Sequence, residues 1–247
     1  MHQDSFIVIK MRFVGLQIKN LLQLKFKAFF LLIFFGIYCI KAKASPPRLD
    51  IRQLKIKAKQ SLAFCRQRGF NTRYCILIDM SLPSGVKRFA VWDFKKNDTL
   101  LTGLVSHGCG RNPWSGVWSK DKPAFSNQDG SHCTALGKYQ VDGRAYSAWG
   151  IHVKYYLTGL ERTNNNALAR QIVFHSWEHV AEAEVYPNGT PEGWGCPAVS
   201  NHTMKVVDAL LRKQQKHLLM WVYAPPAPPK PSPEGRALRK SPQPGEI

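Results

Sequence analysis

Acidic residues are scarce in this sequence: 16 Asp and Glu stand against 35 Lys and Arg, which gives a net charge of +19. Such an excess of positive charge favours an anionic partner, either nucleic acid, lipid or an anionic polymer. Zinc-finger spacing and glycine–aromatic RNA signatures are missing, and the basic residues are scattered along the chain. We therefore expect no nucleic-acid partner. Peripheral contact with an anionic envelope surface is one expectation, and solvated charge that only keeps the protein soluble is the alternative.

The apolar stretch near the N-terminus is too short for a membrane-spanning helix. It covers the thirteen residues 28–40, whereas about 20 are needed to cross a bilayer. Seven Lys and Arg and one Asp precede or flank this stretch within residues 1–44, and Ala42-Lys43-Ala44 follows it. This order is typical of a secretory signal peptide. We expect cleavage after Ala44 and export to the periplasm or cell envelope, with an uncleaved N-terminal anchor as the alternative.

Cysteine is also scarce. Removal of residues 1–44 takes Cys39 away and lowers the net charge to +13, and an odd number of cysteines remains: Cys65, Cys75, Cys109, Cys133 and Cys196. In an oxidising compartment four of them could form two disulfides. Cys65–Cys75 and Cys109–Cys133 are the pairings we expect, and a fully reduced set is the alternative. Either way, an odd exported cysteine is a candidate reactive thiol.

Internal repeats are absent, and the pattern beyond residue 44 indicates one mainly-β domain with a few helices. The expected helices cover residues 49–68, ended by Gly69, and 203–213. Short turns join the first three expected strands into an antiparallel meander. The seven expected strands are 74–80, 88–94, 100–106, 136–141, 150–156, 171–175 and 218–223.

The remaining segments set the expected domain boundaries. Residues 107–132 are rich in Gly, Ser and Asn, which predicts a long functional loop. The proline-rich residues 224–247 cannot form a packed core, so we expect a disordered tail. The predicted organisation is a signal peptide (1–44), an N-terminal helical segment (45–72), a catalytic domain (73–223) and the tail.

One stretch carries the chemistry. An apolar strand ends at His175, and the sequence Gly-Trp-Gly-Cys-Pro follows twenty-one residues later with the cysteine at position 196. The two glycines allow a tight backbone whose amides can face a carbonyl oxygen. A nearby imidazole can take the proton of a thiol and so produce a nucleophile. We therefore predict Cys196 as nucleophile and His175 as base.

These residues resemble the L,D-transpeptidase (YkuD-like) family, whose hallmark is a His followed at about this distance by a [S/T]-x-G-C element. The Cys-Pro-Ala sequence starting at Cys196 is similar to the murein L,D-transpeptidase catalytic domain branch. The resemblance extends over residues 74–223. It is carried by the segments 79–85, 88–89, 103–108, 125–127, 135–139 and 159–161.

The resemblance implies a β-sandwich or barrel fold and a mechanism without cofactor or metal. Cys196 would attack a carbonyl in a murein tetrapeptide stem, expel the terminal D-alanine and pass the acyl group to an amine. The Ser176 carbonyl would orient His175, and the amides of Gly195 and Cys196 would form the oxyanion hole. We expect three residues to contact substrate or line the site: Trp194, Gly193 and Trp177. Gly193 departs from the family, which usually has Ser or Thr there.

Three alternatives remain open at this point. Residues 175–179 also read as H-x-x-E-H, a zinc motif that requires both histidines on one helix. Water could replace the amine acceptor, which would make the enzyme an L,D-carboxypeptidase. The basic surface and Gly193 would also suit a degenerate wall-binding module, although the retention of Cys196 and His175 argues against that.

Overall fold

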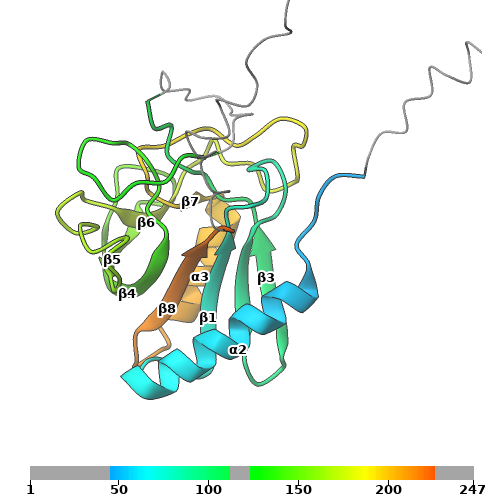
Figure 1. Ribbon diagram of the computed structural model, residues 1–247, viewed down its shortest axis with the longest axis vertical. Coiled ribbons are helices and arrows are strands. Elements are labelled where there is room, and N and C mark those ends of the chain that lie inside the picture. The colour runs from blue at the N-terminus through cyan, green and yellow to red at the C-terminus, as the bar shows by residue number, and fades with distance from the viewer. Residues whose placement is uncertain (1–44, 112–122, 226–247) are drawn as a thin grey trace, which may run out of the picture. The chain divides into compact units, whose positions relative to one another are not determined.

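The computed structural model describes residues 45–111 and 123–225 (Figure 1). The predicted signal peptide and most of the predicted proline-rich tail lie outside these ranges. Within them, no helix is long and apolar enough to cross a membrane.

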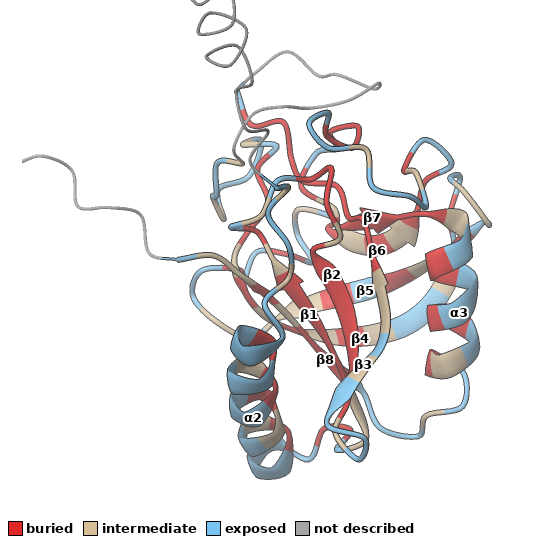
Figure 2. Ribbon diagram, turned by 90° about the vertical axis from the view of Figure 1, so that its right-hand side faces the viewer, coloured by how far each residue is buried: buried red, intermediate tan, exposed pale blue. Residues whose placement is uncertain are grey.

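Helix α2 (Ile51–Arg68) begins and ends where its capping residues require. The Asp50 side chain accepts a hydrogen bond from the Arg52 amide, and Gly69 adopts a left-handed backbone with φ of 73°. Its buried face holds Leu54, Ala58, Ser61 and Cys65. That face packs on strands β1 and β8, while the opposite face is exposed (Figure 2). The helix predicted from spacing is thereby confirmed.

The outer face of α2 concentrates positive charge. The helix has no acidic residue and six basic ones: Arg52, Lys55, Lys57, Lys59, Arg66 and Arg68. Lys57 lies over the rings of Trp221 and Tyr223. The other five basic side chains are exposed, so the surface of α2 carries a cluster of positive charge.

Eight strands form one sheet in the order β3-β2-β1-β8-β4-β5-β6-β7. The strands β1, β2 and β3 form the predicted antiparallel meander, and β8 lies parallel to β1. The strands are β1 (Tyr74–Asp79), β2 (Phe89–Asp93), β3 (Asp98–Gly103), β4 (Gly137–Tyr146), β5 (Val153–Gly159), β6 (Val173–Ser176), β7 (Ala198–Val199) and β8 (Leu218–Tyr223). Strand β7 was not predicted, because two residues carry no periodicity.

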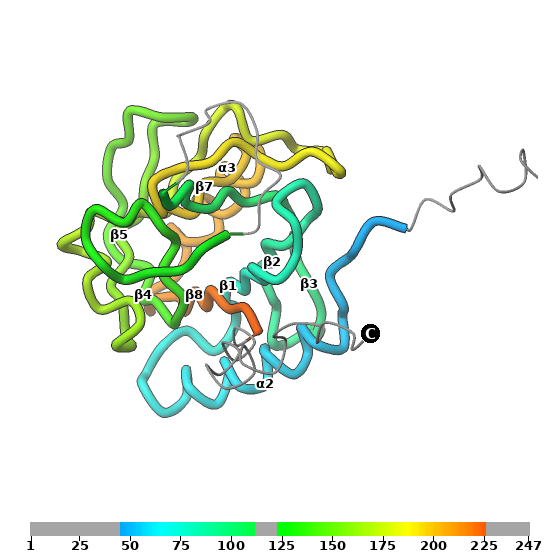
Figure 3. The backbone as a smooth tube through the Cα atoms, turned by 45° about the horizontal axis from the view of Figure 1, so that its top comes forward, coloured from blue at the N-terminus to red at the C-terminus, as the bar shows by residue number. Residues whose placement is uncertain are grey.

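The sheet curls into a barrel-like arc, which confirms the mainly-β expectation (Figure 3). Helix α3 (Asn201–Leu211) contacts both β3 and β6, so it lies on the open side of the arc. A bridge between Val105 and Val199 joins the segment after β3 to β7. The two ends of the sheet therefore meet at one place, beside the predicted catalytic residues.

Strand β1 is buried on both faces. Ile76 and Ile78 belong to the core inside the arc, whereas Cys75 and Leu77 belong to the layer under α2. This arrangement explains why β1 reads as a continuous apolar run rather than an alternating one.

The two predicted disulfides are absent, because all five cysteines in the described residues are free thiols. Cys65 and Cys75 lie in the apolar layer under α2. Burial raises the pKa of Cys65 to about 12 and that of Cys75 well above its ordinary value. These two side chains are therefore protonated and pack as small apolar groups.

Candidate active site

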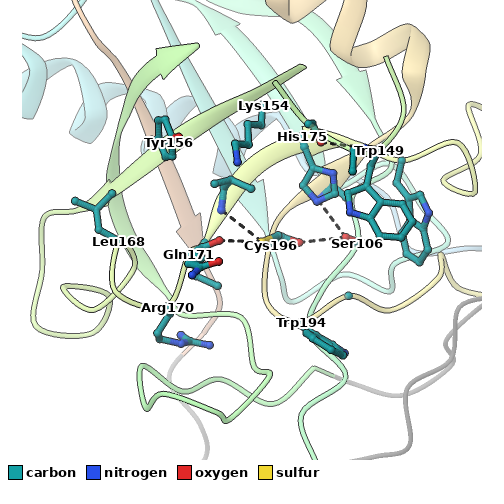
Figure 4. Close-up of a pocket in the computed structure, with 17 residues that line it drawn as sticks. Ser106, Trp149, Lys154, Tyr156, Leu168, Arg170, Gln171, His175, Trp194 and Cys196 are labelled. Carbon is teal, nitrogen blue, oxygen red and sulfur yellow. Dashed lines mark hydrogen bonds between the residues drawn. The ribbon is translucent and has the colours of Figure 1, made fainter. Parts of the chain in front are cut away.

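The β6–β7 pair brings the predicted nucleophile and base together. His175 of β6 is the register partner of Ala198 in the parallel strand β7, and Cys196 lies two residues before Ala198. Both predicted catalytic side chains line one pocket (Figure 4). The pairing of these two short strands thus brings together two residues that lie 21 positions apart in the sequence.

The His175 ring is held in one tautomer. Its Nδ1 lies 2.9 Å from the carbonyl oxygen of Ser176, and a carbonyl can only accept, so Nδ1 carries the proton. Nε2 of the neutral ring therefore keeps its lone pair. Burial is the main cause that lowers the pKa of His175 below its ordinary value, and Lys154 adds to it. The neutral imidazole can act as a general base.

The Sγ atom of Cys196 lies between two backbone groups. The Val173 amide donates to it at 3.4 Å, and the thiol faces the Gln171 carbonyl at 3.8 Å (Figure 4). Burial raises the pKa of the Cys196 thiol, although the Val173 amide and nearby cations oppose the shift. The resting site therefore holds a thiol and a neutral imidazole, and proton transfer has to accompany nucleophilic attack.

Only glycine fits at position 195. Its φ is 105°, and an added Cβ would lie 2.5 Å from the backbone oxygen of Cys133. Within the described residues, the Gly195 and Cys196 amides have no hydrogen-bond acceptor, so both remain able to bind an oxyanion. Gly193 differs, because an added Cβ would meet nothing closer than 3.8 Å. Its backbone has room for the Ser or Thr that the family usually carries.

The segment that follows β3 holds in place the loop that carries the predicted nucleophile, residues 193–197, which we call the nucleophile loop. The Ser106 hydroxyl donates to the Cys196 carbonyl at 3.3 Å and accepts from the Ala198 amide at 3.0 Å. The Gly193 amide donates to the His107 carbonyl at 2.8 Å, and the Cys109 amide donates to the Gly193 carbonyl at 2.9 Å. With the bond from the Ser106 amide to the Ala198 carbonyl at 2.8 Å, five hydrogen bonds join the two segments around Cys196.

A buried positive charge, that of Arg88, supports the contact between these two segments. Arg88 is fully buried and donates to the carbonyls of Leu82 and Val105 and to Nδ1 of His107. The proton of His107 is therefore on Nε2, which lies 3.6 Å from a carboxylate oxygen of Glu192. Burial, with Arg88 as a second cause, lowers the pKa of His107 to about 3. The imidazole is neutral, and it braces the loop rather than forming an ion pair.

The pocket has a volume of about 890 Å³ and a largely aromatic and apolar wall. The predicted site residues Trp194, Gly193 and Trp177 all line it. Trp194 is 60% exposed and stacks on His132. Trp177 is buried and packs edge-on against Trp149.

The geometry required by the zinc motif is absent. Residues 173–176 are a strand and residues 178–179 lie in a turn, so His175 and His179 do not share a helix face. In the described part of the chain, no group of three or more His, Cys, Asp and Glu side chains is placed to hold a metal. The H-x-x-E-H interpretation requires both histidines on one helix, and the structure shows that this requirement is not met.

Sequence reasoning missed Lys154, Ser106 and Arg170, which also line the pocket. Lys154 lies in a predicted strand, where nothing in the local pattern marks one lysine as a site residue. Ser106 stands beside His107 in one of the segments that carried the resemblance, so that signal was available.

The sequence profile described as L,D-transpeptidase catalytic domain matches residues 47–222, more than two thirds of the chain. No curated protein matches the sequence.

Solved structures with a similar fold include the helical cell shape determining protein Pgp2 from Campylobacter jejuni. Its TM-score is 0.39 at 10% identity, over 69% of this chain and 56% of that one. An L,D-transpeptidase from Xylanimonas cellulosilytica has a TM-score of 0.31 at 13% identity, over 65% of this chain and 68% of that one. The match spans about half the length of Pgp2.

Proposed function

The chain belongs to the L,D-transpeptidase catalytic domain family, and we propose that it is an exported murein L,D-transpeptidase. In this proposal Cys196 forms a thioester with a tetrapeptide stem, and an amine on a second stem resolves it. The observation that carries the proposal is the β6–β7 pairing, which places Cys196 and an oriented His175 in one pocket.

Acylation would proceed by concerted proton transfer. The thiol proton moves to Nε2 of His175 as Sγ attacks the stem carbonyl. The amides of Gly195 and Cys196 bind the oxyanion, and each such donor supplies roughly 3–4 kcal/mol of transition-state stabilisation. The C–N bond then breaks, and His175 returns the proton to the leaving amine. The acceptor amine reverses this sequence and releases the crosslinked product.

The first test is intact-protein mass spectrometry of residues 45–247 with a carbapenem, which can acylate a nucleophilic cysteine. We expect one stable adduct on wild-type protein, none on the Cys196→Ala variant, and no effect of a chelator. A Cys109→Ala variant is the matched control and should still form the adduct. A folded wild-type protein that forms no adduct would support the degenerate wall-binding module instead.

Product analysis then identifies the acceptor. Incubation with purified tetrapeptide dimers and monomers should give crosslinked stems if an amine resolves the thioester. Release of tripeptide with no crosslinked product would identify an L,D-carboxypeptidase that uses water.

The basic face of α2 supports the envelope contact expected from the charge. Within the described residues, Arg52 is the one basic side chain of α2 with an ion pair, which it forms with Asp50 at 3.7 Å. Each basic residue near an anionic surface contributes about 1 kcal/mol. Replacing Lys55, Lys59 and Arg66 by Gln should weaken co-sedimentation with anionic vesicles and leave acylation unchanged. Unaltered co-sedimentation would assign the charge to solubility alone.

A further inference from the structure

Lys154 lies beside the predicted base. It is the register partner of His175 in the antiparallel β5–β6 pair, and residues paired in this way project from the same face of the sheet with Cβ atoms about 5 Å apart. Both side chains line the pocket, and Figure 4 shows them on the same side of Cys196.

Among the described residues, the pocket is lined by two cationic side chains and by no carboxylate. Its lining residues include Lys154 and Arg170 but neither Asp nor Glu. Arg170 already donates to the backbone oxygens of Ser126 and Cys133, at 3.0 and 2.7 Å. It is therefore committed to holding the pocket wall.

Lys154, in contrast, has no anionic partner in the described part of the chain. Its Nζ lies 5.4 Å from the centre of the Tyr156 ring. The residue is only half-buried, yet its ammonium group faces a largely apolar cavity. A cation in such surroundings is stabilised by a ligand that brings a negative charge.

We propose that Lys154 binds the C-terminal carboxylate of the donor stem, on the residue that is expelled when Cys196 is acylated. This inference rests on the proposed function. His175 protonates the leaving amine, so that nitrogen has to lie at the His175 ring. The carboxylate carbon of the leaving residue is two bonds from the same nitrogen, which places it beside the neighbour of His175 on β5.

The proposed contact would restrict the reaction to the last residue of a stem. Sγ attacks the carbonyl of the penultimate residue, the C–N bond breaks, and the terminal amino acid leaves with its carboxylate and the proton from His175. A stem with a further residue, or with a blocked C-terminus, presents no charge at Lys154.

The test compares tetrapeptide donors with a free and an amidated C-terminus. We expect wild-type kcat/KM for acylation to be about 10- to 100-fold lower for the amide, as for loss of a charge-assisted hydrogen bond. Lys154→Met should lose activity on the free acid by a similar factor and treat both donors alike, within about 2-fold. Lys154→Arg should keep most of the preference for the free acid.

Two controls separate this contact from damage to the site. Alkylation of Cys196 by neutral iodoacetamide should proceed at a similar rate in wild type and in Lys154→Met. Lys205→Met, on the exposed side of α3, should behave as wild type with both donors. A wild-type protein that is acylated equally by both donors, or a Lys154→Met variant that keeps the preference, overturns the role of Lys154 alone. Failure of every donor to acylate Cys196 overturns this role together with the proposed function.

Discussion

Two histidines, the buried His107 and the half-buried His175, each lie close to a cysteine and a glycine in sequence or in space, and they are held in opposite tautomers. His175 donates from Nδ1 to the Ser176 carbonyl, whereas His107 accepts at Nδ1 from Arg88. Burial lowers the pKa of both rings. The hydrogen-bond partner of Nδ1 therefore determines which ring nitrogen carries the proton and which keeps a free lone pair.

The difference assigns the two rings to different roles. His175 lines the pocket, and its unprotonated Nε2 can take a proton. His107 is 1% exposed, and its Nε2–H faces Glu192, one residue before the nucleophile loop. In the proposed mechanism His175 takes the proton, whereas His107 supports the loop, although in the sequence it is His107 that stands beside a glycine and a cysteine.

Replacing each histidine by Gln is the strongest test of this comparison. His175→Gln removes the base and should lower the acylation rate by about 10²- to 10⁴-fold, with little change in melting temperature. His107→Gln should keep the rate within about 5-fold and cost about 1–3 kcal/mol of stability, because Arg88 and Glu192 lose a well-fitted partner. Stopped-flow acylation and thermal unfolding measure the two effects, and a large rate loss in His107→Gln would contradict the assignment.

The two glycines of the nucleophile loop give a second, smaller contrast. Gly195→Ala forces a Cβ against the Cys133 carbonyl at a φ that alanine avoids, so we expect acylation to fall by about 10- to 100-fold. Gly193→Ser restores the residue type usual in the family and meets no close atom. It should change the rate by less than about 3-fold. Equal effects of the two substitutions would show that the loop can shift to accommodate a side chain at position 195.

The pH dependence of stability should report the buried His107. Its pKa falls from an ordinary 6.5 to about 3 on folding, so between these values the unfolded chain binds a proton that the folded chain refuses. Stability is then full above pH 6.5 and falls by about 1.4 kcal/mol per pH unit towards pH 3.

Denaturant titrations between pH 7 and 5 avoid most carboxylate protonation. Wild-type protein should lose stability over this window, and His107→Gln should lose about 1 kcal/mol less per pH unit. His175→Gln should also flatten the curve, because folding lowers the pKa of His175 in the same direction. Parallel curves for wild type and His107→Gln would contradict the low pKa of His107.

Local sequence predicted the elements that depend on local chemistry. Asp50 and Gly69 bound α2 because they satisfy the free groups of the helix ends, and β-branched and aromatic runs predicted β1, β2 and β8 within a few residues. Segments too short to show a hydrophobic periodicity were not predicted. Strand β7 exists only because β6 and the Val105 segment pair with it.

The candidate site divides in the same way. Cys196, His175 and the need for glycine at 195 were readable in sequence, because thiol, imidazole and a tight turn are properties of single residues. The tautomer of His175, the place of Lys154 beside it, the free cysteines and the buried contact of Arg88 with His107 depend on which distant segments pack together. Spacing along the chain carries no information on that packing, so the tertiary structure alone decided it.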